Sequence, residues 1–434
     1  MIRDRRAVLA LLTGLNFLNY IDRAVIATVV KPMKGELGLS NFEAGLLGSA
    51  FMVGYLATSP LFGALANRRP RTELIGLGVA IWSVGTVASG FAHGFATLFV
   101  ARAVVGVGEA SFTVLAPTII DDVTPPGKKG KALAVFFLAI PLGYALGYIL
   151  GGAIAHGWGW RSAFFVTGGP GIVLAASCLW IAEPPRALLD AKAGLIEGMR
   201  AIARIPLFRR AVLGYCAYAA ATGAFSYWAP NFLLERFPGR LDDATANFWF
   251  GIVLVAAGAI GTFLGGYLVD RGQRALPPAA PDAPYDAPEL KAQVNVALRV
   301  CALGVLAAVP LTALCFVMPS PAGFFALAFA AEIGVFLSTS PIGVAVLRSV
   351  PLERRAAAMA GSVLAIHLLG DLWSPALLGG LQDVLPVVIA MMALPLTFAW
   401  SGYLWWPRRR EAAAPPASPT DRGGLPEASV HPAS

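Results

Sequence analysis

The chain has 434 residues, of which 57% are hydrophobic and 13% are charged, with a formal net charge of +8 and a mean hydropathy of +0.68. Soluble domains carry about 25% charged residues, so this composition excludes an ordinary soluble protein. It is typical of an all-α polytopic membrane protein, because apolar windows of about 20 residues, each able to cross the hydrocarbon as a helix, recur along the sequence. A transmembrane β-barrel is excluded, since barrel strands alternate in polarity and these windows do not.

Polar breaks predict twelve transmembrane helices in two groups of six. The expected spans are 8–30, 44–66, 73–92, 95–121, 131–155, 162–182, 210–235, 246–269, 295–317, 322–347, 356–380 and 384–406. They predict an N-terminal six-helix bundle (1–182), a cytoplasmic linker with an amphipathic helix (183–209), a C-terminal six-helix bundle (210–406) and a cytoplasmic tail (407–434). The tail and the loop 275–292 are rich in Pro and Ala, so we expect both to be disordered.

The distribution of basic residues predicts the orientation. Connections on one side carry 26 of the 33 Lys and Arg residues and those on the other side carry five, while Arg23 and Arg102 fall inside spans. Because Lys and Arg collect in cytoplasmic loops, both termini are expected in the cytoplasm, with the protein in the cell (inner) membrane. The same asymmetry accounts for the net charge, so no nucleic-acid partner is expected.

The first span contains NYIDR, residues 19–23, and thus places Asp22 beside Arg23 in an apolar segment. A charge at the bilayer centre costs roughly 2.5–3.5 kcal/mol, so such residues usually face a cavity or one another. At about 100° per residue, Asn19, Tyr20 and Arg23 share one face, and we expect this face to meet a substrate headgroup. Asp22 points away from it, toward an adjacent helix that we take to be the fourth.

The fourth span carries Arg102 and Glu109, which lie seven residues apart and hence on one face, with Gly106 between them. A buried carboxylate near Arg is ionised, and it takes a proton when that Arg is diverted to an anionic substrate. We therefore predict that Asp22 and Glu109 couple protons, that Arg23 and Arg102 bind the headgroup, and that all meet in a water-reachable pocket. The alternative is a static charge network that sets helix register.

The fifth span spaces Gly143, Gly147 and Gly151 by four residues, which predicts close helix packing and a surface that can slide. In the C-terminal half, we group Glu332, His367 and Asp371 as a candidate polar site, since His367 and Asp371 are i, i+4 on one helix face. Hydrogen-bonded core residues are an equally good interpretation of these three. The four cysteines fall inside spans and no metal-ligand spacing occurs, so neither a metal nor a cofactor is expected.

An internal repeat relates the two halves. GALANRRPR (63–71) after the second span matches GYLVDRGQR (266–274) after the eighth, and Gly151-Gly152 in the fifth span is echoed by Gly379-Gly380 in the eleventh. Two halves with matched elements are the signature of a parallel repeat, with substrate held between the halves near the midplane.

These loops resemble the signature loop of the major facilitator superfamily, and the arrangement of six plus six spans agrees. Within it the chain resembles Spinster-type lipid transporters, through stretches from both halves: NYIDR (19–23), RAVVGVGEASFTVLAPTII (102–120), FFLAIPLGYALGYILGG (136–152) and HLLGDLWSPALLGGLQD (367–383). The resemblance implies a major facilitator fold of two six-helix bundles, with coupling acids and headgroup arginines at the matching positions. It also implies a conformational latch at the loops, for which the candidates are Asn67, Arg68, Arg71, Asp121, Asp122, Asp270, Arg271 and Arg274. Asn67 departs from the usual Asp.

We therefore expect a monomeric, proton-coupled secondary transporter of amphipathic anionic lipids, such as a lysophospholipid or a sphingosine-phosphate-like molecule, that works by alternating access among membrane lipids. The alternatives are a proton-coupled symporter of small organic anions such as sugar acids, or a multidrug exporter. A transporter-like receptor or a lipid-modifying membrane enzyme is a different class of function, and the sequence offers no nucleophile–base pair for an enzyme.

Overall fold

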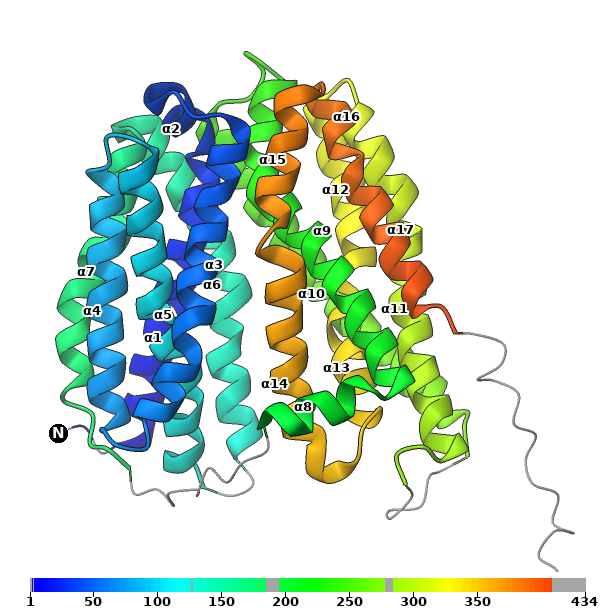
Figure 1. The fold of residues 1–434 in the computed structure, drawn as a ribbon. Helices are drawn as coiled ribbons and strands as arrows, with labels where there is room; N and C mark the ends of the chain where they lie inside the picture. The colour runs from blue at the N-terminus through cyan, green and yellow to red at the C-terminus, as the bar shows by residue number, and fades with distance from the viewer. Residues whose placement is uncertain (1, 3, 126–127, 185–194, 278–283, 408–434) are drawn as a thin grey trace, which may run out of the picture.

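A computed structural model describes residues 2, 4–125, 128–184, 195–277 and 284–407 of the chain. Two bundles of long helices stand side by side (Figure 1). We call the end of the molecule that carries Ile2 and α8 the lower end, and the end that carries α2 and α16 the upper end. Parts of three predicted segments lie outside the described residues, namely 185–194 of the linker, 278–283 of the Pro-rich loop and 408–434 of the tail.

The N-terminal bundle is made by seven helices. They are α1 (Arg5–Thr28), α2 (Val30–Leu37), α3 (Asn41–Leu65), α4 (Arg71–Gly90), α5 (Phe95–Val123), α6 (Lys129–Trp158) and α7 (Trp160–Cys178). Within it, α1 packs along α6, α3 packs along α5, and α4 lies between α5 and α7. The first span therefore reaches the fourth span and the fifth, which is the arrangement that a charge cluster shared between α1 and α5 requires.

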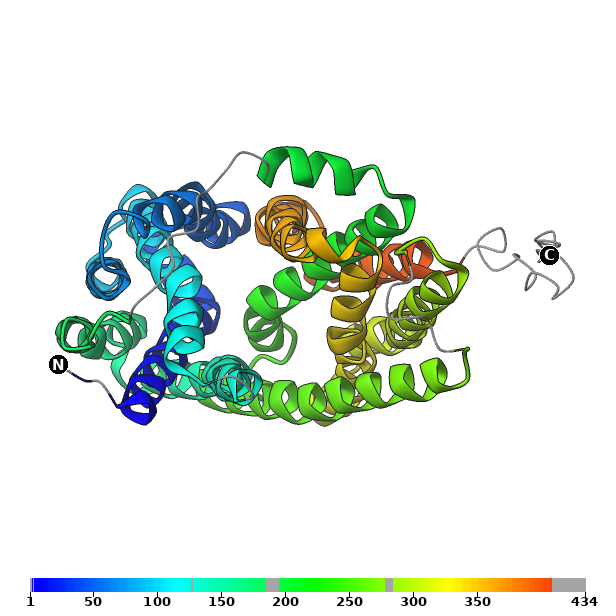
Figure 2. The ribbon, with the colours of Figure 1, turned by 90° about the horizontal axis from the view of Figure 1, so that it is seen from below.

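The C-terminal bundle follows the short linker helix α8 (Leu195–Ala203). It contains α9 (Pro206–Arg236), α10 (Asp243–Arg274), α11 (Pro288–Val317), α12 (Pro321–Phe336), α13 (Thr339–Arg348), the 3₁₀ turn η1 (Leu352–Arg354), α14 (Arg355–Ile366), the π-helical turn η2 (His367–Asp371), α15 (Ser374–Val384), α16 (Val387–Met391) and α17 (Ala393–Trp405). In the view from the lower end, α8 lies on the flank of this bundle next to α14 (Figure 2).

The last three predicted spans are each apolar enough to cross a membrane as one stretch, but their helices are interrupted. The tenth divides into α12 and α13, the eleventh into α14, η2 and α15, and the twelfth into α16 and α17. In the eleventh, Pro375 has no N–H to donate to a carbonyl in the preceding turn, which opens the helical ladder where η2 ends. The predicted disordered loop 275–292 was too long, because α11 begins at Pro288. Within the linker, the described residues include α8 and the start of α9.

Nine helical stretches of the described residues are long and apolar enough to cross a membrane. The other three predicted spans are occupied by α1, α7 and α9, which are less apolar or carry more charge. A count of twelve spans thus stays a prediction, although every predicted segment is helical.

Glycines set the contact between α1 and α6. A Cβ placed on Gly143 would lie 2.7 Å from Tyr20 Cβ, and one on Gly147 would lie 2.7 Å from both Ala24 Cβ and the Ile21 carbonyl oxygen. Gly151 faces Thr28 in the same way. The three glycines let the two backbones approach more closely than any side chain would allow, and this approach places Tyr20 and its neighbours at the centre of the bundle.

The hydrophobic cores show where the bundles are joined. One core, which runs from Ile21–Met33 of the first bundle to Ala224–Phe237 of the second, includes residues of both bundles. The other two cores each belong to one bundle: the first contains Leu12 and Ile119, and the second contains Val212 and Ile342. Because the shared core lies in the upper half, the bundles are sealed together at the upper end, with the principal contacts made by α3 with α15 and α6 with α10.

Candidate functional site

An ion pair between the first and fourth spans forms the centre of the N-terminal bundle. Arg23 Nε on α1 donates to Glu109 Oε2 on α5 over 2.5 Å. The Glu109 side chain is fully buried, and that of Arg23 is 11% exposed. The packing of α1 against α5 brings the two charges together, so each compensates the desolvation of the other.

Aromatic rings surround the guanidinium of Arg23. Its Cζ lies 4.9 Å from the ring centroid of Tyr20, 5.0 Å from that of Phe51 and 5.4 Å from that of Tyr55. Arg102 also faces the Phe51 ring, at 5.6 Å. Phe51 on α3 is therefore shared by the two arginines, and the ring faces stabilise both cations where water is scarce.

Asp22 is held by the third span and not by the fourth. Thr86 on α4 donates its hydroxyl to Asp22 Oδ2 over 2.5 Å, so the hydrogen bond of Asp22 is made to the third span. Arg102 on the fourth span lies within electrostatic range of Asp22. Sequence periodicity gives the direction in which Asp22 points from the axis of α1, but it does not say which helix lies there.

Several polar atoms of this cluster keep unused hydrogen-bonding capacity. Among the described residues, no partner is present for Arg102 Nε and Nη1, for either amide atom of Asn19, for Asp22 Oδ1 or for Glu109 Oε1. Buried polar atoms without partners are uncommon in native structures, and their concentration here makes the cluster able to bind a proton or a polar group. Arg102, Asp22 and Glu109 are buried, and the Arg23 side chain is 11% exposed, so a water-reachable pocket shared by all four stays a prediction.

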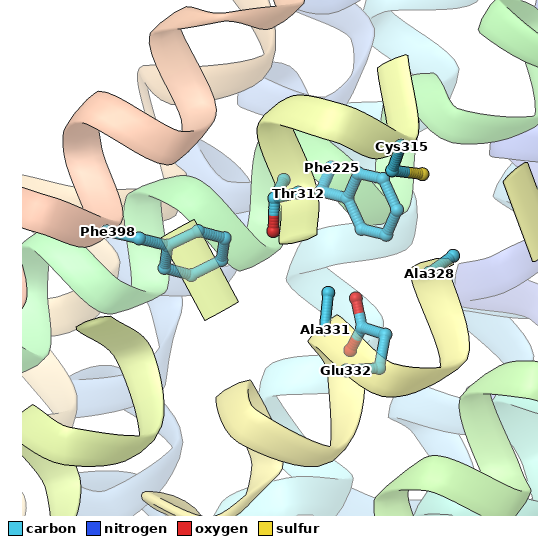
Figure 3. Close-up of a pocket in the computed structure, with 7 residues that line it drawn as sticks. All are labelled: Phe225, Thr312, Cys315, Ala328, Ala331, Glu332 and Phe398. Atoms are coloured by element: carbon cyan, nitrogen blue, oxygen red, sulfur yellow. The ribbon is translucent and has the colours of Figure 1, made fainter. Parts of the chain in front are cut away.

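Glu332 is the buried acid of the C-terminal bundle. Its carboxylate points into a small hollow lined by Phe225, Thr312, Cys315, Ala328, Ala331, Glu332 and Phe398 (Figure 3). It is 8% exposed, and no cation faces it among the residues that the structure describes. An unpaired carboxylate between aromatic rings suits a proton or a cationic group.

His367 and Asp371 form a separate pair. His367 Nδ1 lies 3.0 Å from Asp371 Oδ2 within η2, and neither residue lines the hollow at Glu332. We had grouped the three residues as one candidate polar site, but the structure places Glu332 apart from the pair of His367 and Asp371. The His367 ring instead meets the Tyr55 ring edge-on, with centroids 6.0 Å apart, so it touches the aromatic residues around Arg23 from across the bundle interface.

The candidate latch residues divide into two groups. At the lower end of the N-terminal bundle, Arg71 pairs with Asp122 at 2.7 Å and with Glu183 at 2.8 Å. Lys129 pairs with Asp121 at 2.6 Å. Asn67 and Arg68 form the turn after α3, and their backbone amides donate to Ala64 and Leu65. Asp270, Arg271 and Arg274 are exposed at the end of α10, and these three have no ion pair with any described residue, so the second loop does not repeat the network of the first.

Five residues of these networks, Lys129 among them, were not predicted as site residues. Phe51, Tyr55 and Thr86 are ordinary residues of apolar spans, and only the spacing of Phe51 and Tyr55 by four residues could have indicated a shared face. Glu183 closes the sixth span in a stretch otherwise read as linker. The rise of acidic character immediately after an apolar span, on the Arg-rich side of the protein, is the signal that could have identified it.

Comparison with known proteins gives a consistent result. A family model described as Major Facilitator Superfamily matches residues 12–281. The chain is 32% identical over 398 residues to Protein spinster of Drosophila melanogaster, covering 88% of this chain and 63% of that protein, so it spans less than two thirds of that relative. It is 32% identical to the probable sphingolipid transporter spinster homolog 1 of Arabidopsis thaliana, covering 85% of this chain and 81% of the relative.

Among solved structures, the fold is similar to that of a bacterial homolog to the human lysosomal transporter Spinster in an inward-facing and unoccupied conformation. The TM-score is 0.79 at 24% identity, with 93% of this chain and 96% of the other covered.

Proposed function

This chain belongs to the major facilitator superfamily and, within it, to the Spinster-type transporters, and we propose that it carries amphipathic anionic lipids by proton-coupled alternating access. One observation supports the coupling more than any other, namely the buried pair of Arg23 and Glu109. A second acid, Asp22, and a second arginine, Arg102, lie in the same cluster with unused hydrogen-bonding atoms. The cluster thus holds both signs of charge that coupled binding of a proton and an anion requires.

The proposed exchange uses one arginine for two partners. An anionic headgroup that reaches Arg23 competes with Glu109 for the same guanidinium. Glu109 would then be a buried carboxylate without its cation, which is costly in a site of low polarity. Binding a proton relieves this cost, so headgroup and proton are taken up together and released together. Asn19 and Tyr20, on the face of α1 that carries Arg23, would complete the headgroup site.

A lipid substrate is supported by the surroundings of the cluster. Phe51, Tyr55 and Tyr20 present apolar surface next to the two cations, as a molecule with a charged head and an apolar tail requires. One relative is named as a probable sphingolipid transporter. Glu332 adds an unpaired negative group in the other bundle, which suits a headgroup that carries an ammonium as well as a phosphate. The pair of His367 and Asp371 would be coupled to the cluster through the contact of His367 with Tyr55.

The lower end is proposed to face the cytoplasm. The connections at this end carry most Lys and Arg residues of the sequence, which is the pattern of cytoplasmic loops. With the upper ends sealed by a shared core, the conformation is then inward-facing. The bundles 1–182 and 210–406 would rock against each other, the glycines of α6 would slide along α1, and Arg71 with Asp122 and Glu183 would hold the lower end of the first bundle in one of the two states.

The two other classes of transporter differ in substrate. A symporter of small organic anions needs a polar cavity without a place for a tail, and a multidrug exporter would not need both arginines. We infer no catalytic role, and a receptor-like protein would bind lipid without moving it.

Purified protein in vesicles with an imposed pH gradient tests the proposal. Uptake of lysolipids should exceed uptake of sugar acids and neutral drugs, and it should collapse when a protonophore removes the gradient. Uptake that ignores the gradient would refute proton coupling. Preferred uptake of sugar acids would establish the small-anion alternative, and binding of lipid without accumulation would indicate a receptor.

A further inference from the structure

The seam between α3 and α15 is more specific than the rest of the bundle interface. Its residues follow one another in antiparallel order: Asp383 meets Asn41, Gly379 meets Asn41, Pro375 meets Gly45, and Leu372 meets Ser49. Pro375, Gly379 and Asp383 on α15, and Leu372 just before it, belong to the stretch HLLGDLWSPALLGGLQD. The proposed proton and headgroup sites involve only part of this stretch. The seam lies in the upper half, where the bundles are sealed.

Asp383 binds the first turn of α3 from the opposite bundle. Its Oδ1 accepts from the backbone N–H of Asn41 and its Oδ2 accepts from that of Phe42, both over 2.8 Å. The first N–H groups of a helix have no partner within the helix, and a carboxylate there is also favoured by the helix dipole. The contact is therefore a helix cap supplied in trans.

The cap of α3 is incomplete without this carboxylate. Ser40 and Glu43 form a capping box within α3, in which the Ser40 hydroxyl accepts from Glu43 N and the Glu43 carboxylate accepts from Ser40 N. The box leaves the N–H groups of Asn41 and Phe42 without a local acceptor, and these are the two that Asp383 binds. When the bundles separate at the upper end, both groups lose their partner.

Gly379 allows the approach that this cap needs. A Cβ on Gly379 would collide with the carbonyl oxygen of Asn41, whereas one on the neighbouring Gly380 would only reach ordinary contact with Phe42 Cδ2 at 3.4 Å. Lys34 adds a second bridge next to the first, since its Nζ bonds Asn41 Oδ1 and pairs with Glu235 of α9 at 3.2 Å. Backbone, cap and ion pair thus converge on Asn41.

The internal repeat shows that this device is present on one seam only. Gly152, the counterpart of Gly380 in the repeat, lies on α6 and packs on the first turn of α10, where its Cβ would lie 2.6 Å from Asn247 Cβ. At that seam α10 is capped by its own Asp242, which accepts from Thr245 N over 2.6 Å. The residue that corresponds to Asp383 is Ala155. Among the described residues, the α6/α10 seam shows no carboxylate of one bundle bonded to a helix N-terminus of the other, whereas the α3/α15 seam does.

We propose that Asp383 is the latch of the outer gate, which closes the α3/α15 seam by completing the cap of α3 and releases it when the protein turns outward. The inference rests on the proposed alternating access and orientation, but not on the substrate or on protons. Because a cap of this kind is exposed and worth little compared with a buried core, it can be made and broken in each cycle.

The test uses the variant Ser49→Cys as a reporter at the inner end of the seam. Ser49 is buried, so in sealed right-side-out vesicles a membrane-impermeant maleimide can reach a thiol there only when the outer gate opens. Asp383→Ala should raise the labelling rate about threefold to tenfold, which is the equilibrium factor expected for a lost cap. Gly379→Ala should raise it as well, because the added methyl separates the helices.

Two matched controls keep the test decisive. Asp242→Ala removes a cap that lies within one bundle, and Gly380→Ala adds a methyl where there is room, so both should leave the rate unchanged. Equal rates for Asp383→Ala and its parent, or an equal rise for Asp242→Ala, would overturn the proposal. Elution of each purified variant as a single folded species identifies any variant that fails to fold, and accessibility of a C-terminal tag in the same vesicles shows separately whether the orientation is correct.

Discussion

Arg23 and Glu109 are 86 residues apart in the sequence, yet Arg23 Nε lies 2.5 Å from Glu109 Oε2 inside the N-terminal bundle. Breaking a buried pair by removing one partner typically costs about 3–5 kcal/mol, because the other charge is left uncompensated. A substrate anion that replaces the carboxylate at Arg23 avoids part of this cost, and a proton on Glu109 avoids the remainder. The pair therefore explains why an apolar helix carries charge at its centre.

Replacement of Glu109 by Gln should abolish uptake driven by a pH gradient and leave lipid binding in place. The amide keeps the shape of the side chain and can still accept from Arg23, but it cannot gain or lose a proton. Uptake in vesicles with and without the gradient measures the effect, and the exposed acid Glu73, changed to Gln, is the control. If gradient-driven uptake survives in Glu109→Gln, the proton is carried elsewhere.

Replacement of Arg23 by Ala should reduce the affinity for anionic lipids by about tenfold to a hundredfold, since a hydrogen bond to a charged group contributes roughly 1.5–3 kcal/mol. Neutral lipids of equal tail length should lose much less, because they retain the apolar contacts. Equilibrium binding of the two lipids to the purified variant decides the matter. Parallel losses for both would assign Arg23 a structural role.

Replacement of Glu332 by Gln should reduce affinity for lipids that carry an ammonium group by about tenfold, because one charge-assisted contact is removed. Binding of a purely anionic lysolipid should change little. The comparison is made by competition against one labelled lipid. A change of the same size for both lipids would show that Glu332 does not read the ammonium, and no change for either would remove it from the substrate site.

Replacement of Glu183 by Gln should lower the free energy of unfolding by about 0.5–1 kcal/mol, as expected for loss of one partly exposed ion pair. Arg71 keeps Asp122, so the network is weakened and not destroyed. Asp121→Asn is the matched control, since its pair with Lys129 is about 40% exposed on both sides and should contribute less. Thermal unfolding in detergent measures both variants, and the difference should shrink at high salt. Equal stability of Glu183→Gln and the parent would show that Asp122 alone holds Arg71.

The arrangement of helices was largely accessible from the sequence, since every predicted span is helical. The interruptions within the last three spans were not predicted, because hydropathy continues across each break in the helix. Leu368 lies within η2 and Leu372 directly follows it, and leucine is equally common in a regular apolar helix. Composition therefore does not predict the π turn. Pro375 was the available signal, but prolines also occur within unbroken helices of this protein, such as Pro117 in α5.

The sequence predicted which residues form the candidate site, but not which of them contact one another. A charge within an apolar span is conspicuous in any sequence, so Asp22, Arg23, Arg102 and Glu109 could be identified one by one. Their partners could not, because Thr86 and Phe51 are unremarkable in their own spans. The grouping of Glu332 with His367 and Asp371 failed for the same reason: membership of one bundle does not place side chains on facing surfaces.

Hydropathy, the asymmetry of basic residues and the spacing of the repeats are properties of sequence segments. They alone predict a membrane protein, its two halves and the charges within its spans. Whether Arg23 bonds Glu109 or Asp22, and whether Asp383 caps its own bundle or the other one, depends on the rotation and approach of helices distant in sequence. Those quantities are set by packing at glycines such as Gly147 and Gly379, where a displacement of one or two ångströms makes or breaks a hydrogen bond. For that reason only the folded molecule selects the partners.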